Sequence, residues 1–132
     1  VVGVDIDPEN VVRAERQAGN QPRVDVQLGD AHQLPFQPEC KDLVLLFEAI
    51  YYLRGPAQFL REAWRVLRPG GKLLLTSVNC EWGGFHRSPS SLQYFGASEM
   101  RSVLDECGFG GAVFAAFPDR RQGFRDAGVA VL

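Results

Sequence analysis

Short apolar runs alternate with amphipathic helical stretches along this chain, and this alternation narrows the folds that it can adopt. A helix between two strands places those strands parallel, because a short hairpin cannot join parallel neighbours. We therefore predict an α/β fold, a mostly parallel sheet with helices on both faces. The last two strands have only a short turn between them and should form an antiparallel pair at one edge. The expected strands are 1–5, 23–28, 42–47, 72–78, 111–117 and 127–132.

The residues at the helix ends support this division. Asp7 can cap a helix that opens with Pro8 and ends at Gly19. A second helix should begin at Gly55-Pro56 and end at the Pro69-Gly70-Gly71 turn. Ser98 is expected to cap a third helix that stops at Gly108. The stretch from 79 to 96 follows neither period and is predicted to be an irregular loop.

Composition excludes several partners. The chain has 132 residues, enough for one domain, which we assign to 1–132. Fourteen basic and sixteen acidic residues give a net charge of -2, which argues against a nucleic-acid partner. The three cysteines lie far apart, without the spacing of a zinc site, so no metal is expected and a cytoplasmic location is favoured. No apolar run approaches the ~20 residues that would cross a membrane.

Two aspartates follow successive predicted strands, where ligands bind in open α/β sheets. Asp5 ends the first strand and can accept hydrogen bonds from both hydroxyls of a ribose; the alternative is a helix cap, a role that Asp7 fills better. Asp30 follows the second strand and can accept from an exocyclic amine, with the N–H of Ala31 donating to a ring nitrogen. The alternative for Asp30 is a simple turn residue. His32 is expected to be a solvated loop residue.

Five segments, in order and with matching spacing, resemble class I S-adenosylmethionine-dependent methyltransferases, closest to the type 11 subgroup. They are GVDID with PENVVRAE, GDAHQLPF, DLVLLFEAIYYL, FLREAWRVLRPGGKLLLTSVN and FGASEMRSVLDECGF. The resemblance implies a Rossmann-like sheet and S-adenosylmethionine as cofactor. It assigns the ribose to Asp5, the adenine to Ile6, Asp30 and Ala31, the methionine part to Phe47 and Glu48, and acceptor-facing positions to Tyr51 and Tyr52.

The family's first strand and glycine-rich loop would lie upstream of Val1. We therefore expect an N-terminally truncated domain that begins at the family's second strand, and a natural protein that is longer. In the family's order the missing strand lies between the strands at 1–5 and 42–47. Its absence would expose sheet edges, which favour a homo-oligomer or a strand-donating partner.

The acceptor side is less determined. Transfer to a hydroxyl or a protonated amine needs a general base, for which His86, Tyr52 and Glu48 are candidates. The loop from Asn79 onward combines glycines with Trp82, Phe85 and Tyr94, and reads as a substrate lid or as a cover for the sheet edge. The predicted function is methyl transfer to a small molecule. Two alternatives stay open: a non-catalytic partner-binding subunit, and a nicotinamide-dependent oxidoreductase, which explains Asp5 but not GDAHQLPF.

Overall fold

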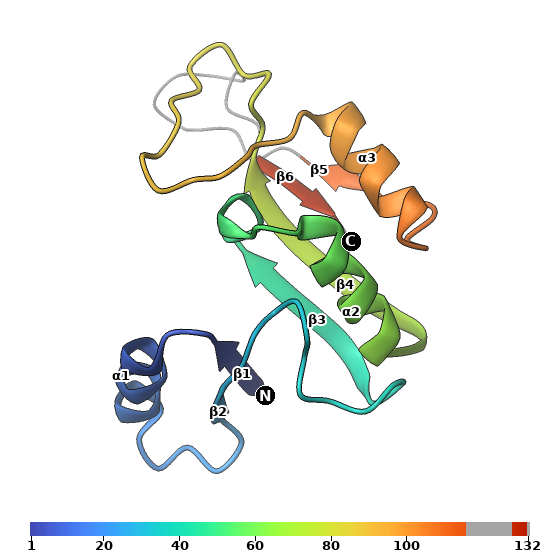
Figure 1. The fold of residues 1–132 in the computed structure, drawn as a ribbon. Coiled ribbons are helices and arrows are strands. Elements are labelled where there is room, and N and C mark those ends of the chain that lie inside the picture. Colours follow the sequence, from blue (N-terminus) through green and yellow to red (C-terminus); the bar gives the residue numbers. More distant parts are fainter. Residues whose placement is uncertain (116–127, 132) are drawn as a thin grey trace.

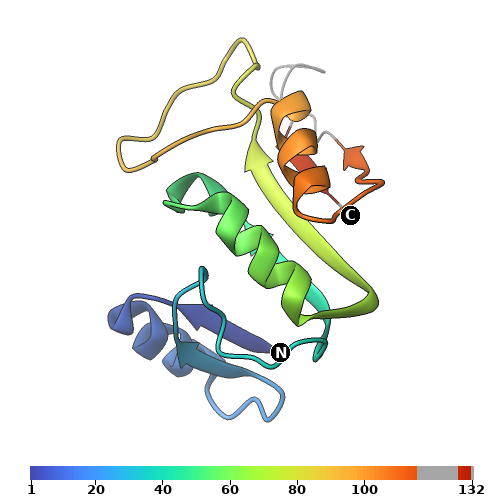
Figure 2. The same cartoon turned by 45° about the vertical axis from the view of Figure 1, so that its right-hand side comes forward.

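The computed structural model describes residues 1–115 and 128–131 as two sheets accompanied by helices (Figures 1 and 2). The smaller sheet pairs β1 with β2, and the larger has the order β3-β4-β6-β5. The elements are β1 (Val2–Asp5), α1 (Pro8–Ala18), β2 (Asp25–Leu28), β3 (Lys41–Phe47), the 3-10 turn η1 (Ile50–Tyr52), α2 (Pro56–Val66), β4 (Leu67–Val78), α3 (Ala97–Glu106), β5 (Phe114–Ala115) and β6 (Gly128–Val131).

The β1–α1–β2 unit forms as its sequence predicts. The two strands are parallel, with Asp5 opposite Leu28 at their carboxyl ends. Asp7 caps α1 by accepting a hydrogen bond from the Glu9 N–H, and the helix ends at Gly19, whose φ is 55°. The expected cap and stop residues are confirmed, and α1 is the crossover helix that allows β1 and β2 to run parallel.

The larger sheet contains the expected antiparallel pair. β3 and β4 are parallel, whereas β6 runs antiparallel to both β4 and β5. The described part of β5 is shorter than the predicted 111–117. The predictions for residues 116–127, which include the polar turn with Arg120 and Arg121, lie outside the described residues.

The Arg68-Pro69-Gly70-Gly71 segment is a bulge within β4 rather than a turn that precedes the strand. β4 already begins at Leu67, opposite Lys41, but the next pair is Leu43 with Lys72. The four intervening residues bulge out opposite a single residue of β3, and Gly70 has a φ of 81°. A Cβ on Gly71 would lie 2.9 Å from the Arg68 carbonyl oxygen. The prediction that the strand starts at residue 72 was therefore wrong, because the bulge preserves pairing on both of its sides.

The sheet is divided where the family's first strand was expected to be missing. Among the described residues, β1 pairs only with β2 and β3 only with β4 (Figure 1). On β3, Val44 and Leu46 pack against the hydrophobic core. Leu43, Leu45 and Phe47 point to the other face and are about half exposed or more. The α/β, Rossmann-like fold is confirmed, with an open apolar face beside the division.

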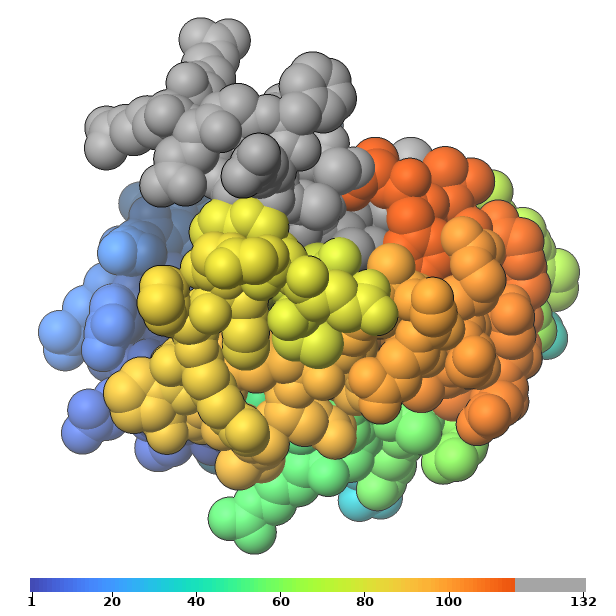
Figure 3. Space-filling view, turned by 90° about the horizontal axis from the view of Figure 1, so that it is seen from above, coloured from blue at the N-terminus to red at the C-terminus, as the bar shows by residue number. Residues whose placement is uncertain are grey.

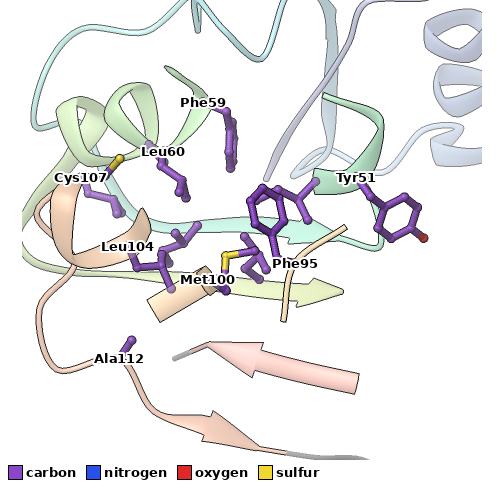
Figure 4. Close-up of a cluster of buried hydrophobic side chains, with 13 residues drawn as sticks. Tyr51, Phe59, Leu60, Phe95, Met100, Leu104, Cys107 and Ala112 are labelled. Carbon is purple, nitrogen blue, oxygen red and sulfur yellow. The ribbon is translucent and has the colours of Figure 1, made fainter. Parts of the chain in front are cut away.

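The hydrophobic core lies between the larger sheet and the helices α2 and α3, which contact each other (Figure 4). Leu60 of α2, Leu75 of β4 and Leu104 of α3 are fully buried in it. α3 begins at Ala97, and Ser98 does not cap it. The Glu81 carboxylate accepts from the Ala97 N–H instead, at 3.3 Å, so the Ser98 prediction was wrong. Within residues 1–115 and 128–131, no helix combines the length and apolar character needed to cross a membrane.

Candidate functional site

Polar and aromatic side chains gather at the carboxyl ends of the parallel strands. Asp5 ends β1, Asp30 follows β2, Glu48 follows β3 and Asn79 follows β4. In open α/β sheets this edge is where ligands bind. The described residues form two groups at this edge: one on β1 and β2, where the sequence predicts the adenosine part of the cofactor, and one on β3, β4 and the loop that follows, where it predicts the acceptor.

The Asp5 carboxylate is held in one orientation by its own chain. Its Oδ1 accepts from the Asp7 N–H at 2.8 Å, and both oxygens lie 3.4 Å from the Asn10 side-chain nitrogen. Asp7, not Asp5, caps α1, so the alternative role for Asp5 is removed. Asn10 was missed by sequence reasoning, although its place in the first turn of α1 offered a signal. Beside them, Ile6 is 68% exposed, an apolar side chain open to contact.

Asp30 is bonded twice to His32. Its Oδ1 accepts from the His32 backbone N–H at 2.8 Å and lies 2.6 Å from the imidazole Nδ1. These bonds, the backbone one first, hold the pKa of the Asp30 carboxyl below its usual range. The His32 Nε2 accepts from the Gly55 N–H at 3.1 Å. The expectation that His32 is a solvated loop residue was wrong: its side chain is 20% exposed and bonded at both nitrogens.

The segment after Ala31 is fastened to α2 by an ion pair. Glu62 Oε2 accepts from the Leu34 N–H at 2.8 Å, and Arg65 makes two 2.7 Å bonds to the Glu62 carboxylate. Arg65 also donates to the carbonyls of Leu34 and Phe36, at 3.1 and 2.8 Å. The Arg65 guanidinium lowers the pKa of the Glu62 carboxyl. This network, which the sequence analysis also missed, fixes the predicted adenine-binding segment against α2.

On the predicted acceptor side, Glu48 has a strained backbone. Its φ is 47°, in a region that non-glycine residues rarely adopt, and its N–H donates to both the carbonyl and the hydroxyl oxygen of Thr76. The Tyr51 hydroxyl donates to Glu48 Oε2 at 3.2 Å. Burial, followed by the Glu48 charge, raises the pKa of Tyr51 well above its usual range, so Tyr51 keeps its proton. Phe47, just before Glu48, is 60% exposed.

The loop from 79 to 96 is closed at its base and anchored to η1. Asn79 and Phe95 form an isolated parallel β-bridge, and the Leu92 N–H donates to the Tyr51 carbonyl at 2.8 Å. Tyr94 stacks on Tyr51 with ring centres 4.8 Å apart, and Phe85 meets Tyr94 edge-on at 4.6 Å. In the view of Figure 3 the yellow surface of this loop lies between the blue N-terminal part and the orange surface of α3.

The predicted acceptor residues differ in their surroundings. Tyr51 is 8% exposed and belongs to the core, so it supports Glu48 and the loop rather than offering its ring (Figure 4). Tyr52 and His86 are exposed, and Trp82 packs over Gly84. A chain of ring contacts and the Tyr51–Glu48 hydrogen bond nevertheless join five side chains into one group: Glu48, Tyr51, Tyr52, Phe85 and Tyr94. No cluster of three or more His, Cys, Asp or Glu that could hold a metal ion occurs in the described part of the chain.

Known proteins similar to this chain share its fold and its sequence pattern. The family model described as "Methyltransferase domain" matches residues 1–75, more than half of the chain. A probable S-adenosylmethionine-dependent methyltransferase of Mycolicibacterium smegmatis is 33% identical over 113 residues, covering 83% of this chain and 43% of that protein. The chain spans less than half the length of the curated relatives it matches.

Solved structures extend the likeness to the whole fold. An S-adenosylmethionine-dependent methyltransferase from Methanosarcina mazei has a TM-score of 0.76 at 18% identity, covering 99% of this chain and 79% of that one. The [4+2]-cyclase SpnF has a TM-score of 0.70 at 28% identity, covering 81% and 41%. The strand order, the two carboxylates and the family match agree, and the chain belongs to the methyltransferase-domain family.

Proposed function

We propose that the protein containing this chain binds S-adenosylmethionine and transfers its methyl group to a small molecule. The observation that supports this best is a pair of carboxylates at the carboxyl ends of two adjacent parallel strands, Asp5 at the end of β1 and Asp30 just after β2, in a chain of the methyltransferase-domain family. Their hydrogen-bond acceptors suit an adenosine: the two oxygens of Asp5 can accept from vicinal hydroxyls, and the Asp30 carboxylate can accept from an exocyclic amine.

The adenosine side would work through groups already held in place. Asp5, oriented by Asn10, would accept from the ribose hydroxyls, and the exposed Ile6 would pack on the purine. Asp30 would accept from the amine, and the Ala31 N–H would donate to the ring. Because these groups are ordered by local bonds, little orientational freedom is lost when the ligand binds.

The acceptor side would need to align a nucleophile and accept a proton. The cofactor supplies an activated methyl group, so the protein's contribution is orientation, exclusion of water and, for some acceptors, a base. Glu48, which follows β3, would be the base: its Oε2 accepts a hydrogen bond from the Tyr51 hydroxyl, and Tyr51 keeps its own proton. Tyr52 and His86 are exposed candidates for the same role, and Trp82 and Phe85 would contact the acceptor from the loop. Phe47 would pack beside the methionine part.

The division of the sheet would be closed by a further strand. Leu43, Leu45 and Phe47 expose one face of β3, and β1 has a strand partner on one side only among the described residues. A parallel strand between β1 and β3 would satisfy both backbone edges. We propose that another segment of the longer protein supplies this strand. The alternatives are a second copy of the chain or a strand-donating partner, and a measurement of the mass of the full-length protein in solution would reveal either one.

The experiment is calorimetry with S-adenosylhomocysteine on the full-length protein. Binding is expected, and Asp5→Ala should weaken it by about a hundredfold or more, since two hydrogen bonds to a charged acceptor are lost. Asp25→Ala is the matched control: the same residue type, exposed, at the opposite end of the same two strands. Heat with a nicotinamide dinucleotide but none with S-adenosylhomocysteine would sink the proposal.

Binding alone does not establish the reaction, because the similar chain SpnF is described as a [4+2]-cyclase. Transfer of a labelled methyl group to candidate acceptors is therefore the second measurement. Binding without transfer to any acceptor in a broad panel would favour a non-methylating or partner-binding role on the same fold.

A further inference from the structure

His32 joins the Asp30 carboxylate to the first residues of α2. Its Nε2 accepts from the Gly55 N–H at 3.1 Å, so the proton of the neutral ring is on Nδ1. Nδ1 then donates to Asp30 Oδ1 over 2.6 Å. The ring is a bridge from the end of β2 to the residue that precedes α2.

The surroundings of the ring leave it little freedom. A Cβ on Gly55 would lie 3.4 Å from the imidazole Cδ2, in ordinary van der Waals contact, so the ring lies directly against the Gly55 backbone. The Gln58 side chain, in the first turn of α2, donates to the His32 carbonyl at 3.1 Å. The backbone N–H of His32 also binds Asp30 Oδ1. Both ends of the imidazole and the peptide on either side of it are therefore fixed.

We infer that His32 is a positioning residue for purine recognition: it occupies Asp30 Oδ1 and thereby orients the other oxygen, Oδ2, toward the exocyclic amine of the bound nucleoside. This inference rests on the proposed function. When Oδ1 accepts two hydrogen bonds, the carboxylate cannot rotate freely and Oδ2 points in one direction. Because Oδ2 can only accept, it favours a purine whose edge offers a hydrogen-bond donor at that place over one that offers an acceptor. The group that His32 helps to select is an amine rather than a carbonyl, hence adenosine over inosine.

Two substitutions separate the two bonds of the ring. The side-chain amide of Asn reaches the place of Nδ1, so His32→Asn keeps a donor for Asp30 but loses the link to Gly55. The longer amide of Gln reaches the place of Nε2, so His32→Gln keeps an acceptor for Gly55 but removes the donor to Asp30. Gln58→Met, which removes only the bond to the His32 carbonyl, is the control for a general loosening of the segment.

The test compares binding of S-adenosylhomocysteine and S-inosylhomocysteine to the full-length protein and its variants, with thermal unfolding to verify that each is folded. His32→Gln should lower the preference for the adenosine ligand about tenfold, the worth of one hydrogen bond to a charged group. His32→Asn should restore most of that preference, and Gln58→Met should weaken both ligands equally. A general structural role would lower both affinities together and leave their ratio unchanged.

The outcomes distinguish the two proposals. If the unaltered protein binds neither ligand, the proposed function fails and this inference fails with it. If it prefers the adenosine ligand and both His32 variants keep that preference, or both lose it to the same extent, the function stands and the role of His32 is refuted.

Discussion

Replacing Arg65 by Met tests whether the ion pair on α2 holds the proposed adenine-binding segment in place. Arg65 makes four hydrogen bonds of 2.7–3.1 Å, two to the Glu62 carboxylate and two to the carbonyls of Leu34 and Phe36. Met keeps most of the aliphatic stem but removes every donor. The side chains of Arg65 and Glu62 are 34% and 17% exposed, so solvent screens part of the attraction.

The expected loss follows from these contacts. Two bonds to backbone carbonyls contribute roughly 0.5–1.5 kcal/mol each. The partly screened ion pair adds about 1 kcal/mol, and Glu62 is left with the Leu34 N–H as its donor among the bonds described. Arg65→Met should therefore lower the free energy of unfolding by about 2–4 kcal/mol. The measurement is the midpoint of urea unfolding of the full-length protein, provided the slope is unchanged.

Arg68→Met is the matched control for this prediction. Arg68 also pairs with a carboxylate, Asp42, at 2.6 Å, but the two side chains are 49% and 82% exposed. An exposed pair of this kind contributes about 0–1 kcal/mol. If the two Met variants lose the same stability, the Arg65 network is not what fixes the segment, and the reasoning from burial and backbone acceptors is refuted.

Three further predictions concern other features. The bonds to His32 hold the pKa of Asp30 below the ordinary value of 3.8, so the ionised carboxylate adds to the free energy of unfolding above that pH, and this contribution is lost as pH falls through the lowered pKa. Asp30→Asn should therefore make the free energy of unfolding, measured with urea, fall less steeply below about pH 4. An unchanged pH profile would contradict this. Gly71→Ala should cost about 1–3 kcal/mol, because the new Cβ meets the Arg68 carbonyl at 2.9 Å, whereas Gly110→Ala, in open space, should change the unfolding midpoint little. If an added strand and its covering elements bury the open face of β3, Leu45→Ser should lower the free energy of unfolding of the full-length protein by about 2 kcal/mol. Leu92→Ser, at an equally exposed position, is the control, and equally small effects of the two changes would argue that this face stays open.

Local signals predicted the local structure. The Asp7 cap, the Gly19 stop and the alternation that produces parallel strands each depend on residues within one turn or one strand, and the structure contains them. The gap in the sheet was predicted from the resemblance, because the order of the family's strands says which neighbours lose their partner, and β1 and β3 are indeed unpaired with each other among the described residues.

Contacts between distant residues could not be predicted in this way. The spacing of Glu62 and Arg65 indicates a helical ion pair, but nothing in the sequence says that their free acceptors and donors meet a loop about 30 residues upstream. Ser98 has the right chemistry for a helix cap, yet Glu81 reaches the first N–H of α3 from across the loop. His32 illustrates the same limit: its partners at 30 and 55 come together only after β3 and η1 have turned the chain back.

These distant polar contacts also explain how a divided sheet can present one site. Among the described residues, β1 and β2 are not hydrogen-bonded to β3, so strand pairing does not hold the proposed adenosine side against the proposed acceptor side. The segment between them does: His32 is bonded to Gly55, and Leu34 and Phe36 are bonded to Glu62 and Arg65. A strand inserted between β1 and β3 would then complete a site in which the contacts with α2 and Gly55 already set the distance between β1 and β3. It follows that breaking the α2 contacts should weaken binding of the adenosine ligand even where the inserted strand is intact, and the Arg65→Met variant, assayed by calorimetry, separates these two contributions.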